Sequence, residues 1–223
     1  MKGEIVYFDE PGPQNTDAVL EIVKNRLKEK DIGYVVVASE SGSTALRVAK
    51  VLKDTGVKIA CVAPYAGYQR ALGRKWPAIN GDRRQELERV GVKILEETQW
   101  IFGCTFDTMF IGDTAPSIAI HKFVSRAFGF GVKTCIEIAL IAAEAGAVPS
   151  DEEIIAVAGT GWLGGGADAA IVIKPCHIHG VKGGDFLKID KGVEVREIIA
   201  MPRVKFSQKL IDEMKKEGRD EPI

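Results

Sequence analysis

The sequence predicts an α/β fold in three layers, with a mostly parallel, twisted sheet between helices on both of its faces. Two observations support this prediction. Short, continuous apolar runs rich in Val and Ile recur along the chain, which is typical of strands covered on both faces of a parallel sheet. Segments with the apolar spacing of amphipathic helices lie between these runs, and this alternation favours helices packed on both sides of one sheet.

Five apolar runs are predicted to form strands. Each run holds four or five residues and is continuously apolar, without an alternation of apolar and polar residues. Both faces of each strand are therefore expected to be buried. The runs span residues 34–38, 59–63, 154–158, 169–173 and 198–201.

Three segments, 15–30, 44–55 and 132–148, have helical periodicity. In the first two, apolar residues recur at the i, i+3, i+4 and i+7 or i+8 spacing of one helix face, and Gly56 is placed to end the second helix. The third segment is apolar almost all round, which is typical of a buried helix with a narrow polar stripe. The apolar positions are Val19, Ile22, Val23 and Leu27, then Ala45, Val48, Ala49 and Leu52, and the stripe consists of Lys133, Glu137 and Glu144.

Length and charge limit the organisation and the partners of the chain. The 223 residues hold no evident linker, so we expect one domain over 1–223 with a frayed tail from about residue 218. Thirty basic and 31 acidic residues give a formal net charge of −1. This balance does not favour a nucleic acid or an anionic membrane as a partner.

The cysteines and the N-terminus indicate a cytoplasmic protein. The four cysteines, Cys61, Cys104, Cys135 and Cys176, are widely spaced and form no C-x-x-C pair, which argues against a disulfide framework and against a thiolate zinc site. The first ten residues carry acids where a signal peptide would be basic and then apolar. No run approaches the ~18 apolar residues of a membrane span.

The most informative segment is the loop that follows the predicted strand at 34–38 and precedes the helix at 44–55. At such a junction the loop amides and the positive end of the helix dipole can hold an anion. Gly42 lets the backbone approach a ligand closely, and the neighbouring hydroxyls add donors. We expect a phosphate-binding loop formed by Ser39, Glu40, Ser41, Gly42, Ser43 and Thr44.

A simpler interpretation of this loop is helix capping alone, because Ser is a preferred N-cap residue. Four hydroxyls around one glycine exceed what capping requires, so both interpretations stay open. The segment matches neither G-x-x-x-x-G-K-[ST] nor G-x-G-x-x-G, and no named nucleotide-binding fingerprint applies to it.

A second loop follows the predicted strand at 154–158. It holds five glycines in the ten residues 159–168, enough for a tight loop whose backbone closes over a ligand. The alternative is a hairpin-like connection without a ligand. The expected ligand-binding residues here are Thr160, Gly161, Gly164, Gly165 and Gly166.

These two loops resemble the C-terminal domain of pyruvate kinase. The run from Val36 to Ala45 is similar to that domain's strand, Ser/Thr-rich loop, Ser-Gly pair and helix, and 159–168 is similar to its loop in which Gly-Trp precedes a Gly-rich turn. The stretches 131–140, 158–161 and 173–175 resemble the stand-alone archaeal and bacterial members of this group still more closely. The resemblance implies the fold predicted above. It does not extend to pyruvate kinase activity, because no stretch here would supply that enzyme's eight-stranded barrel.

The resemblance also implies a ligand. In animal and yeast pyruvate kinases the two loops hold the phosphates of a sugar bisphosphate, but Ser43 and Leu163 stand here where those proteins carry Arg. Without these two guanidinium groups a single phosphate is expected. The stand-alone group implies flavin mononucleotide (FMN), with its phosphate in the loop around Gly42.

Two further groups of residues were weighed as functional. Lys133 is expected to offer a charge to a phosphate, and Glu137 could act as an orienting carboxylate. The alternative is that Lys133 and Glu137 form an i, i+4 pair on a solvent-facing stripe. His177 and His179 could share a metal, but no third ligand is evident, so we expect them to line a pocket and expect no metal. The segment 64–82 is predicted to be a long surface loop.

Three functions are consistent with these residues. The first is binding of a phosphate-bearing small molecule, a mononucleotide such as FMN. The second is a flavin- or phosphate-dependent enzyme, in which Lys133 and His179 would be the first residues to test. The third is a regulatory or subunit-interaction module, since α/β domains of this size often form homo-oligomers.

Overall fold

The computed structural model describes residues 4–103, 108–180 and 184–218, and in these residues the predicted α/β fold is confirmed. Seven strands form one sheet in the order β1-β7-β6-β5-β2-β3-β4. Four of the six neighbouring pairs are parallel, and the two that involve β6 are antiparallel. The strands are β1 (Val6–Phe8), β2 (Tyr34–Ala38), β3 (Lys58–Val62), β4 (Val92–Leu95), β5 (Ile154–Ala158), β6 (Ala169–Lys174) and β7 (Glu194–Pro202).

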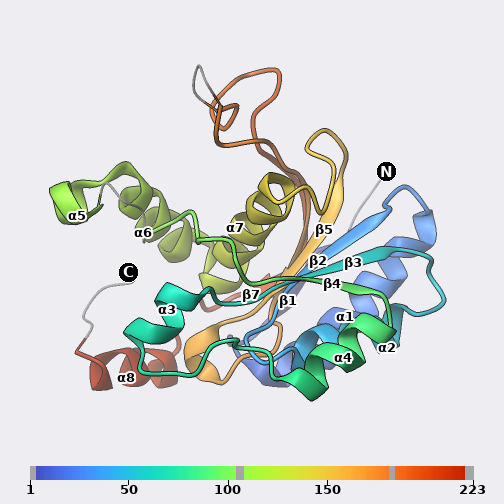
Figure 1. Cartoon of the computed structure of the whole chain (residues 1–223), viewed down its shortest axis with the longest axis horizontal. Coiled ribbons are helices and arrows are strands. Elements are labelled where there is room, and N and C mark those ends of the chain that lie inside the picture. The colour runs from blue at the N-terminus through green and yellow to red at the C-terminus, as the bar shows by residue number, and fades with distance from the viewer. Residues whose placement is uncertain (1–3, 104–107, 181–183, 219–223) are drawn as a thin grey trace.

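Helices cover both faces of this sheet (Figure 1). The α-helices are α1 (Thr16–Arg26), α2 (Ser43–Leu52), α3 (Ala66–Ala71), α4 (Gly81–Arg89), α5 (Thr108–Ile111), α6 (Pro116–Phe128), α7 (Phe130–Glu144) and α8 (Gln208–Lys216). Short 3-10 turns are η1 (Pro13–Asn15), η2 (Leu27–Glu29), η3 (Gly112–Thr114) and η4 (Gly161–Leu163). None of the helices in the described residues is long and apolar enough to cross a bilayer.

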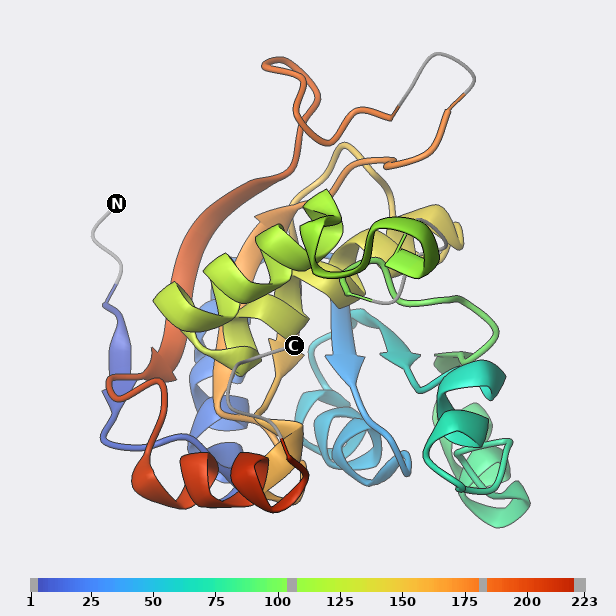
Figure 2. The same cartoon turned by 90° about the vertical axis from the view of Figure 1, so that its left-hand side faces the viewer.

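The alternation of side chains along the strands divides the core into two layers. Val35 and Val37 of β2 belong to a cluster with α1, α2 and α4, whereas Val36 belongs to a cluster with α7. All five residues of β5 are fully buried, as expected for a strand covered on both faces. Helix α6 packs along the outside of α7, and both lie on the face opposite α1, α2 and α4 (Figures 1 and 2).

Several predicted boundaries agree closely with the structure, and others do not. The runs at 34–38 and 154–158 coincide with β2 and β5, and the three predicted helices correspond to α1 with η2, α2 and α7. The predicted surface loop at 64–82 was wrong in part, because it contains α3 and buries Gln69 and Ile79. Cys104 and the residues after Gly218 lie outside the described part of the chain.

The first turn of α7 packs directly on the start of β6. Gly131 has the backbone conformation of an ordinary helical residue, yet a Cβ atom placed on it would lie 2.8 Å from Ala169 Cβ and would collide with Asp168 Oδ1. The missing side chain therefore allows the close approach of helix and strand, since real Cβ atoms keep a larger separation.

We predict that Gly131→Ala destabilises the protein by about 2 kcal/mol or more through overpacking, although Ala is the better helix former by ~1 kcal/mol. Gly81→Ala is the matched control, because Gly81 begins α4 and a Cβ there meets no atom within 4 Å. Urea unfolding followed by circular dichroism measures both changes. Equal midpoints for the two variants would contradict the packing role of Gly131.

Candidate functional site

The two loops singled out from the sequence leave neighbouring parallel strands at one edge of the sheet. Strand β2 pairs in parallel with β5, with Val37 opposite Val157. The chain leaves β2 through α2 toward β3, and it leaves β5 toward β6 on the other side. Adjacent strands whose connections diverge in this way form a topological switch point, where open α/β sheets bind their ligands. The structure thus brings the loops 39–43 and 159–168 together at this point.

The loop after β2 is organised by its serines. Ser39 is buried, and its Oγ accepts a hydrogen bond from the Thr44 amide at 3.2 Å. Ser41 and Ser43 are exposed, and their Oγ atoms lie 3.0 Å apart. Ser39 therefore stabilises the first turn of α2, whereas the hydroxyls of Ser41 and Ser43 face solvent and can turn toward a ligand.

Gly42 has a packing role that the sequence did not reveal. Its φ of +78° lies in the left-handed region, which glycine adopts without strain. A Cβ atom there would lie 2.8 Å from Arg83 Cγ and 2.9 Å from Leu87 Cδ1, both on α4. Gly42 consequently lets α4 pack against the turn that begins α2, and this contact fixes the orientation of the helix N-terminus.

The arginines beside this loop are paired with carboxylates. Arg74 forms an ion pair with Glu40, and about half of each side chain is exposed. Arg83 lies 3.6 Å from Glu86 on the same helix. Exposed pairs of this kind contribute little to stability, so Arg74 can leave Glu40 for an anion at small cost.

The Gly-rich loop after β5 is compact. Gly164, Gly165 and Gly166 all have positive φ, which glycine tolerates and other residues rarely adopt. A Cβ atom on Gly159 would lie 2.6 Å from Gly166 O, so the loop closes on itself. At Gly164 and Gly165 a Cβ would meet nothing within 4 Å, so the backbone of these two residues borders open space.

The same loop is covered by the C-terminal helix. Leu163, which is buried, packs in a cluster with Phe130 of α7 and with Leu210 and Met214 of α8. Thr160 is also buried. The side chain of Leu163 therefore points into the protein, away from any ligand at the sheet edge.

Asp168 ties this loop to two other parts of the chain. Its Oδ2 accepts hydrogen bonds from the amides of Gly12, at 3.0 Å, and of Thr160, at 3.1 Å. Burial raises the pKa of Asp168 to about 6, although bonds from Thr160 and Gly12 favour the charged form. Its Oδ1 lies against Gly131 of α7 without a hydrogen-bond partner among the described residues.

Thr16 makes a second connection between the N-terminal turn and the Gly-rich loop. Its hydroxyl donates to Pro13 O at 2.6 Å and accepts from the Ala167 amide at 3.0 Å. A Cβ atom on Gly166 would lie 2.8 Å from Pro13 Cα. The Gly-rich loop is thus held against the start of α1 by side-chain bonds and by close backbone packing.

Lys133 lies in the first turn of α7, but its ammonium group already has an ion-pair partner. Lys133 Nζ lies 3.0 Å from Glu137 Oε2, and Glu137 Oε1 accepts a hydrogen bond from the Phe102 amide at 2.8 Å. The predicted i, i+4 pair is present, but both side chains are buried rather than on a solvent-facing stripe. Glu137 therefore fixes the segment before α5 to α7, and Lys133 is its ion-pair partner.

The Cys/His segment lies at the opposite edge of the sheet. His177 and His179 have Nδ1 atoms 3.8 and 3.6 Å from the Glu144 carboxylate. Cys176 is buried, which raises the pKa of its thiol to about 11. No group of three or more His, Cys, Asp or Glu residues in the described ranges is arranged to hold a metal ion.

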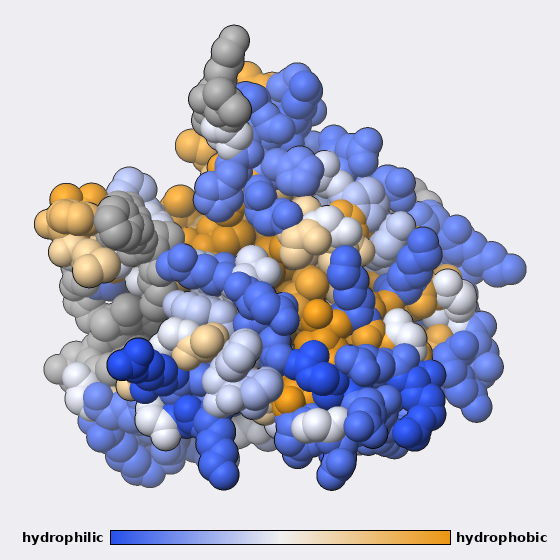
Figure 3. Space-filling model, viewed as in Figure 1, coloured by the Kyte–Doolittle hydropathy of each residue, from blue (hydrophilic) through white to orange (hydrophobic). Residues whose placement is uncertain are grey.

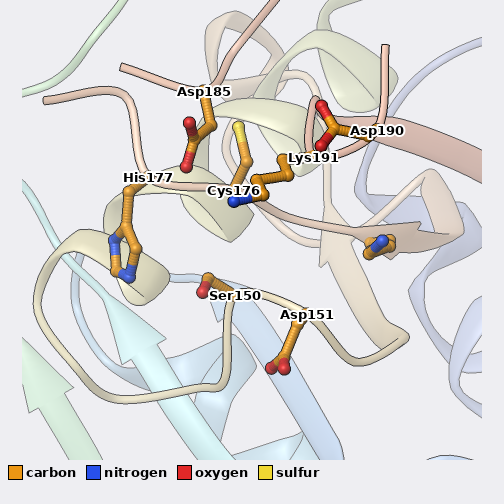
Figure 4. A pocket seen from close by; sticks show the side chains of 8 residues that line it. Ser150, Asp151, Cys176, His177, Asp185, Asp190 and Lys191 are labelled. Carbon is orange, nitrogen blue, oxygen red and sulfur yellow. The ribbon is translucent and has the colours of Figure 1, made fainter. Parts of the chain in front are cut away.

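Cys176 and His177 help to line a hollow of about 240 Å³ (Figure 4). Lys133 and Glu144 are eleven positions apart on α7, which corresponds to about 16 Å along the helix. Because His179 lies beside Glu144, Lys133 and His179 do not share a site. The other lining residues are Ser150, Asp151, Lys174, Asp185, Asp190 and Lys191.

Sequence reasoning missed two features of the candidate edge. Glu96, directly after β4, is buried and forms an ion pair with Arg84 of α4. Trp100 packs against Tyr68, with ring centroids 4.4 Å apart. The position of Glu96 directly after a short apolar run was a signal in the sequence that could have identified it. Nothing in the local sequence indicated that Trp100 packs against Tyr68.

The chain matches a known protein family. Residues 17–173, more than half of the chain, match the model of the family described as pyruvate kinase, alpha/beta domain. The matched region runs from α1 to β6 and includes both loops at the switch point. Strand β7 and α8, which complete the sheet and cover the Gly-rich loop, lie outside it.

The buried carboxylate of Asp168 leads to a prediction about pH. The pKa of Asp168 in the folded protein, about 6, exceeds the ordinary value of 3.8. The neutral carboxyl group therefore stabilises the fold fully below pH 3.8. As pH rises through 6, the free energy of unfolding falls by about 3 kcal/mol in total. Asp168→Asn keeps an oxygen for both amides without the charge, so we expect unchanged or greater stability at pH 7 and a flatter profile between pH 4 and 6.

Asp168→Ala is the informative counterpart, because it leaves the Gly12 and Thr160 amides without their acceptor. We expect it to cost about 2–4 kcal/mol near pH 4 and less at pH 8, where the wild type has itself lost the stabilisation provided by the neutral carboxyl group. Urea unfolding of the three proteins from pH 4 to pH 8 measures these effects. An Asn variant whose profile runs parallel to that of the wild type would show that Asp168 does not titrate as described.

Proposed function

Because this chain belongs to the pyruvate kinase alpha/beta domain family, we propose that it binds a phosphate-bearing small molecule at the edge where β2 and β5 end. The ligand we propose is a mononucleotide such as FMN. The observation that carries the proposal is the switch point itself, where a Ser-rich loop that opens a helix lies beside a compact Gly-rich loop.

The phosphate is proposed to lie at the N-terminus of α2. The first turn of a helix has amides without intrahelical partners and the positive end of the dipole, both of which favour an anion. The exposed hydroxyls of Ser41 and Ser43 add donors there. Arg74 can reach a bound phosphate by exchanging its partner Glu40, and a guanidinium is a strong phosphate ligand.

The structure supports one phosphate rather than two. Leu163 is buried against α8, so that position offers no cation to a second phosphate. Gly164 and Gly165 border open space, and their backbone can approach the rest of the ligand instead. A mononucleotide fits this distribution of one anion site beside an uncharged loop.

Binding is proposed in preference to catalysis because the two residues first considered for a reaction do not meet. Lys133 is neutralised by Glu137, and His179 lies at the far edge beside Glu144. The remaining groups of the candidate edge donate hydrogen bonds or pack the loops.

The proposal predicts that affinity depends on the phosphate. We expect FMN fluorescence to be quenched, or its absorption spectrum to shift, when FMN is titrated with the protein. Riboflavin, which lacks the phosphate, is expected to bind at least 10-fold more weakly. The double variant Ser41→Ala, Ser43→Ala is expected to weaken FMN binding at least 100-fold, because each of the two hydrogen bonds to the charged phosphate contributes about 1.5–3 kcal/mol.

Ser150→Ala is the matched control, because Ser150 lines the hollow at the opposite sheet edge and should leave FMN affinity unchanged. Inorganic phosphate is expected to compete with FMN in the wild type and less in the double variant. Equal affinities for FMN and riboflavin, or full FMN affinity in the double variant, would sink the proposal. Tighter binding of adenosine monophosphate would keep the phosphate site and change the ligand.

A further inference from the structure

An exposed apolar surface runs along the outermost helical layer of the described residues. Helix α6 buries one face on α7 and leaves a stripe of apolar residues exposed on the other, at positions three or four apart. Its centre is Phe123, whose side chain is 68 % exposed. The outward residues of this stripe are Pro116, Ala119, Phe123 and Ala127.

Helix α5 extends this surface away from the body of the protein (Figure 1). Met109 and Phe110 are 79 % and 74 % exposed, and Ile111 is 49 % exposed. Figure 3 shows an apolar group at the outer end of the molecule, where Figure 1 places α5. Phe128, at the other end of α6, is 37 % exposed. We call the residues named in this and the preceding paragraph the α5–α6 surface.

We propose that the α5–α6 surface binds the same surface of a second copy of this chain. The five large side chains Met109, Phe110, Ile111, Phe123 and Phe128 together expose on the order of 600 Å² of apolar area, taking ~200 Å² for a whole large side chain. Two copies would bury about 1,200 Å², which reaches the size of specific protein interfaces. A patch of this size lies at the upper end of what monomers expose.

The stripe on α6 is complementary to itself. Phe123 is flanked four residues away on each side by Ala119 and Ala127, which lie on the same face of the helix. When two α6 helices cross in antiparallel fashion about a two-fold axis, the Phe123 ring of each can lie over the small residues of the other. Small residues allow helices to approach to about 8–10 Å, and a two-fold interface uses identical patches on both subunits.

The charge on α6 favours a protein copy over an anionic membrane. None of the four residues of the stripe is charged, as is typical of the centre of an interface. The exposed Arg126 has its guanidinium group 5.1 Å from the centre of the Phe206 ring of its own chain. Its charge therefore lies beside the stripe and not within it. A helix that binds anionic lipid instead presents a Lys- and Arg-rich polar face.

Analytical ultracentrifugation of the full chain tests this proposal. We expect the wild type at 10–50 μM to sediment with twice the 24.2 kDa mass of one chain, and Phe123→Glu to sediment as a monomer with an unchanged circular dichroism spectrum. Leu187→Glu is the matched control, since Leu187 is 86 % exposed on the segment between β6 and β7 and should leave the dimer intact.

A cross-linking variant keeps the proposal testable if Phe123→Glu fails to fold. Phe123→Cys places one thiol near the two-fold axis, and mild oxidation should give a covalent dimer, while Leu187→Cys should remain largely monomeric on a non-reducing gel. A monomeric wild type, a Phe123→Glu variant that stays dimeric, or equal cross-linking of the two Cys variants would overturn the proposal. So would a monomer that sediments with anionic phospholipid vesicles.

Discussion

The organisation of the candidate edge depends on the buried carboxylate of Asp168. One of its oxygens accepts hydrogen bonds from the amides of Gly12 and Thr160, and the other lies against Gly131. Three segments far apart in the chain thus meet at one side chain: the turn before α1, the Gly-rich loop and the first turn of α7. Burying a carboxylate is costly, as its raised pKa indicates, and hydrogen bonds from fixed amides offset part of that cost.

Contacts within the neighbouring Ser-rich loop and with α4 orient the start of α2. Gly42 lets α4 pack against the start of α2, and Ser39 satisfies the Thr44 amide. These contacts are internal, so they orient the helix N-terminus without using the exposed hydroxyls of Ser41 and Ser43. For the proposed ligand, such a preorganised helix N-terminus would lower the entropic cost of binding.

Much of the central architecture could be predicted from sequence, because β2, β5, α2 and α7 carry strong apolar patterns. The edge elements could not, since β1 has three residues and α4 buries one side chain, Leu87. The antiparallel direction of β6 is a tertiary property that an apolar run cannot reveal. Within the candidate site the loops and the Lys133–Glu137 pair were predictable from the sequence, whereas the bonds that Glu137 and Asp168 accept from the Phe102 and Gly12 amides depend on contacts between distant segments.

Amide chemical shifts test most directly whether an anion binds where β2 and β5 end, as proposed. In ¹H–¹⁵N spectra recorded during titration with FMN, we expect the largest changes at residues 41–45 and 164–166, with those at 41–45 reproduced by inorganic phosphate. Changes confined to the hollow lined by Cys176 and His177 at the opposite edge, with residues 41–45 unmoved at saturation, would contradict the proposal.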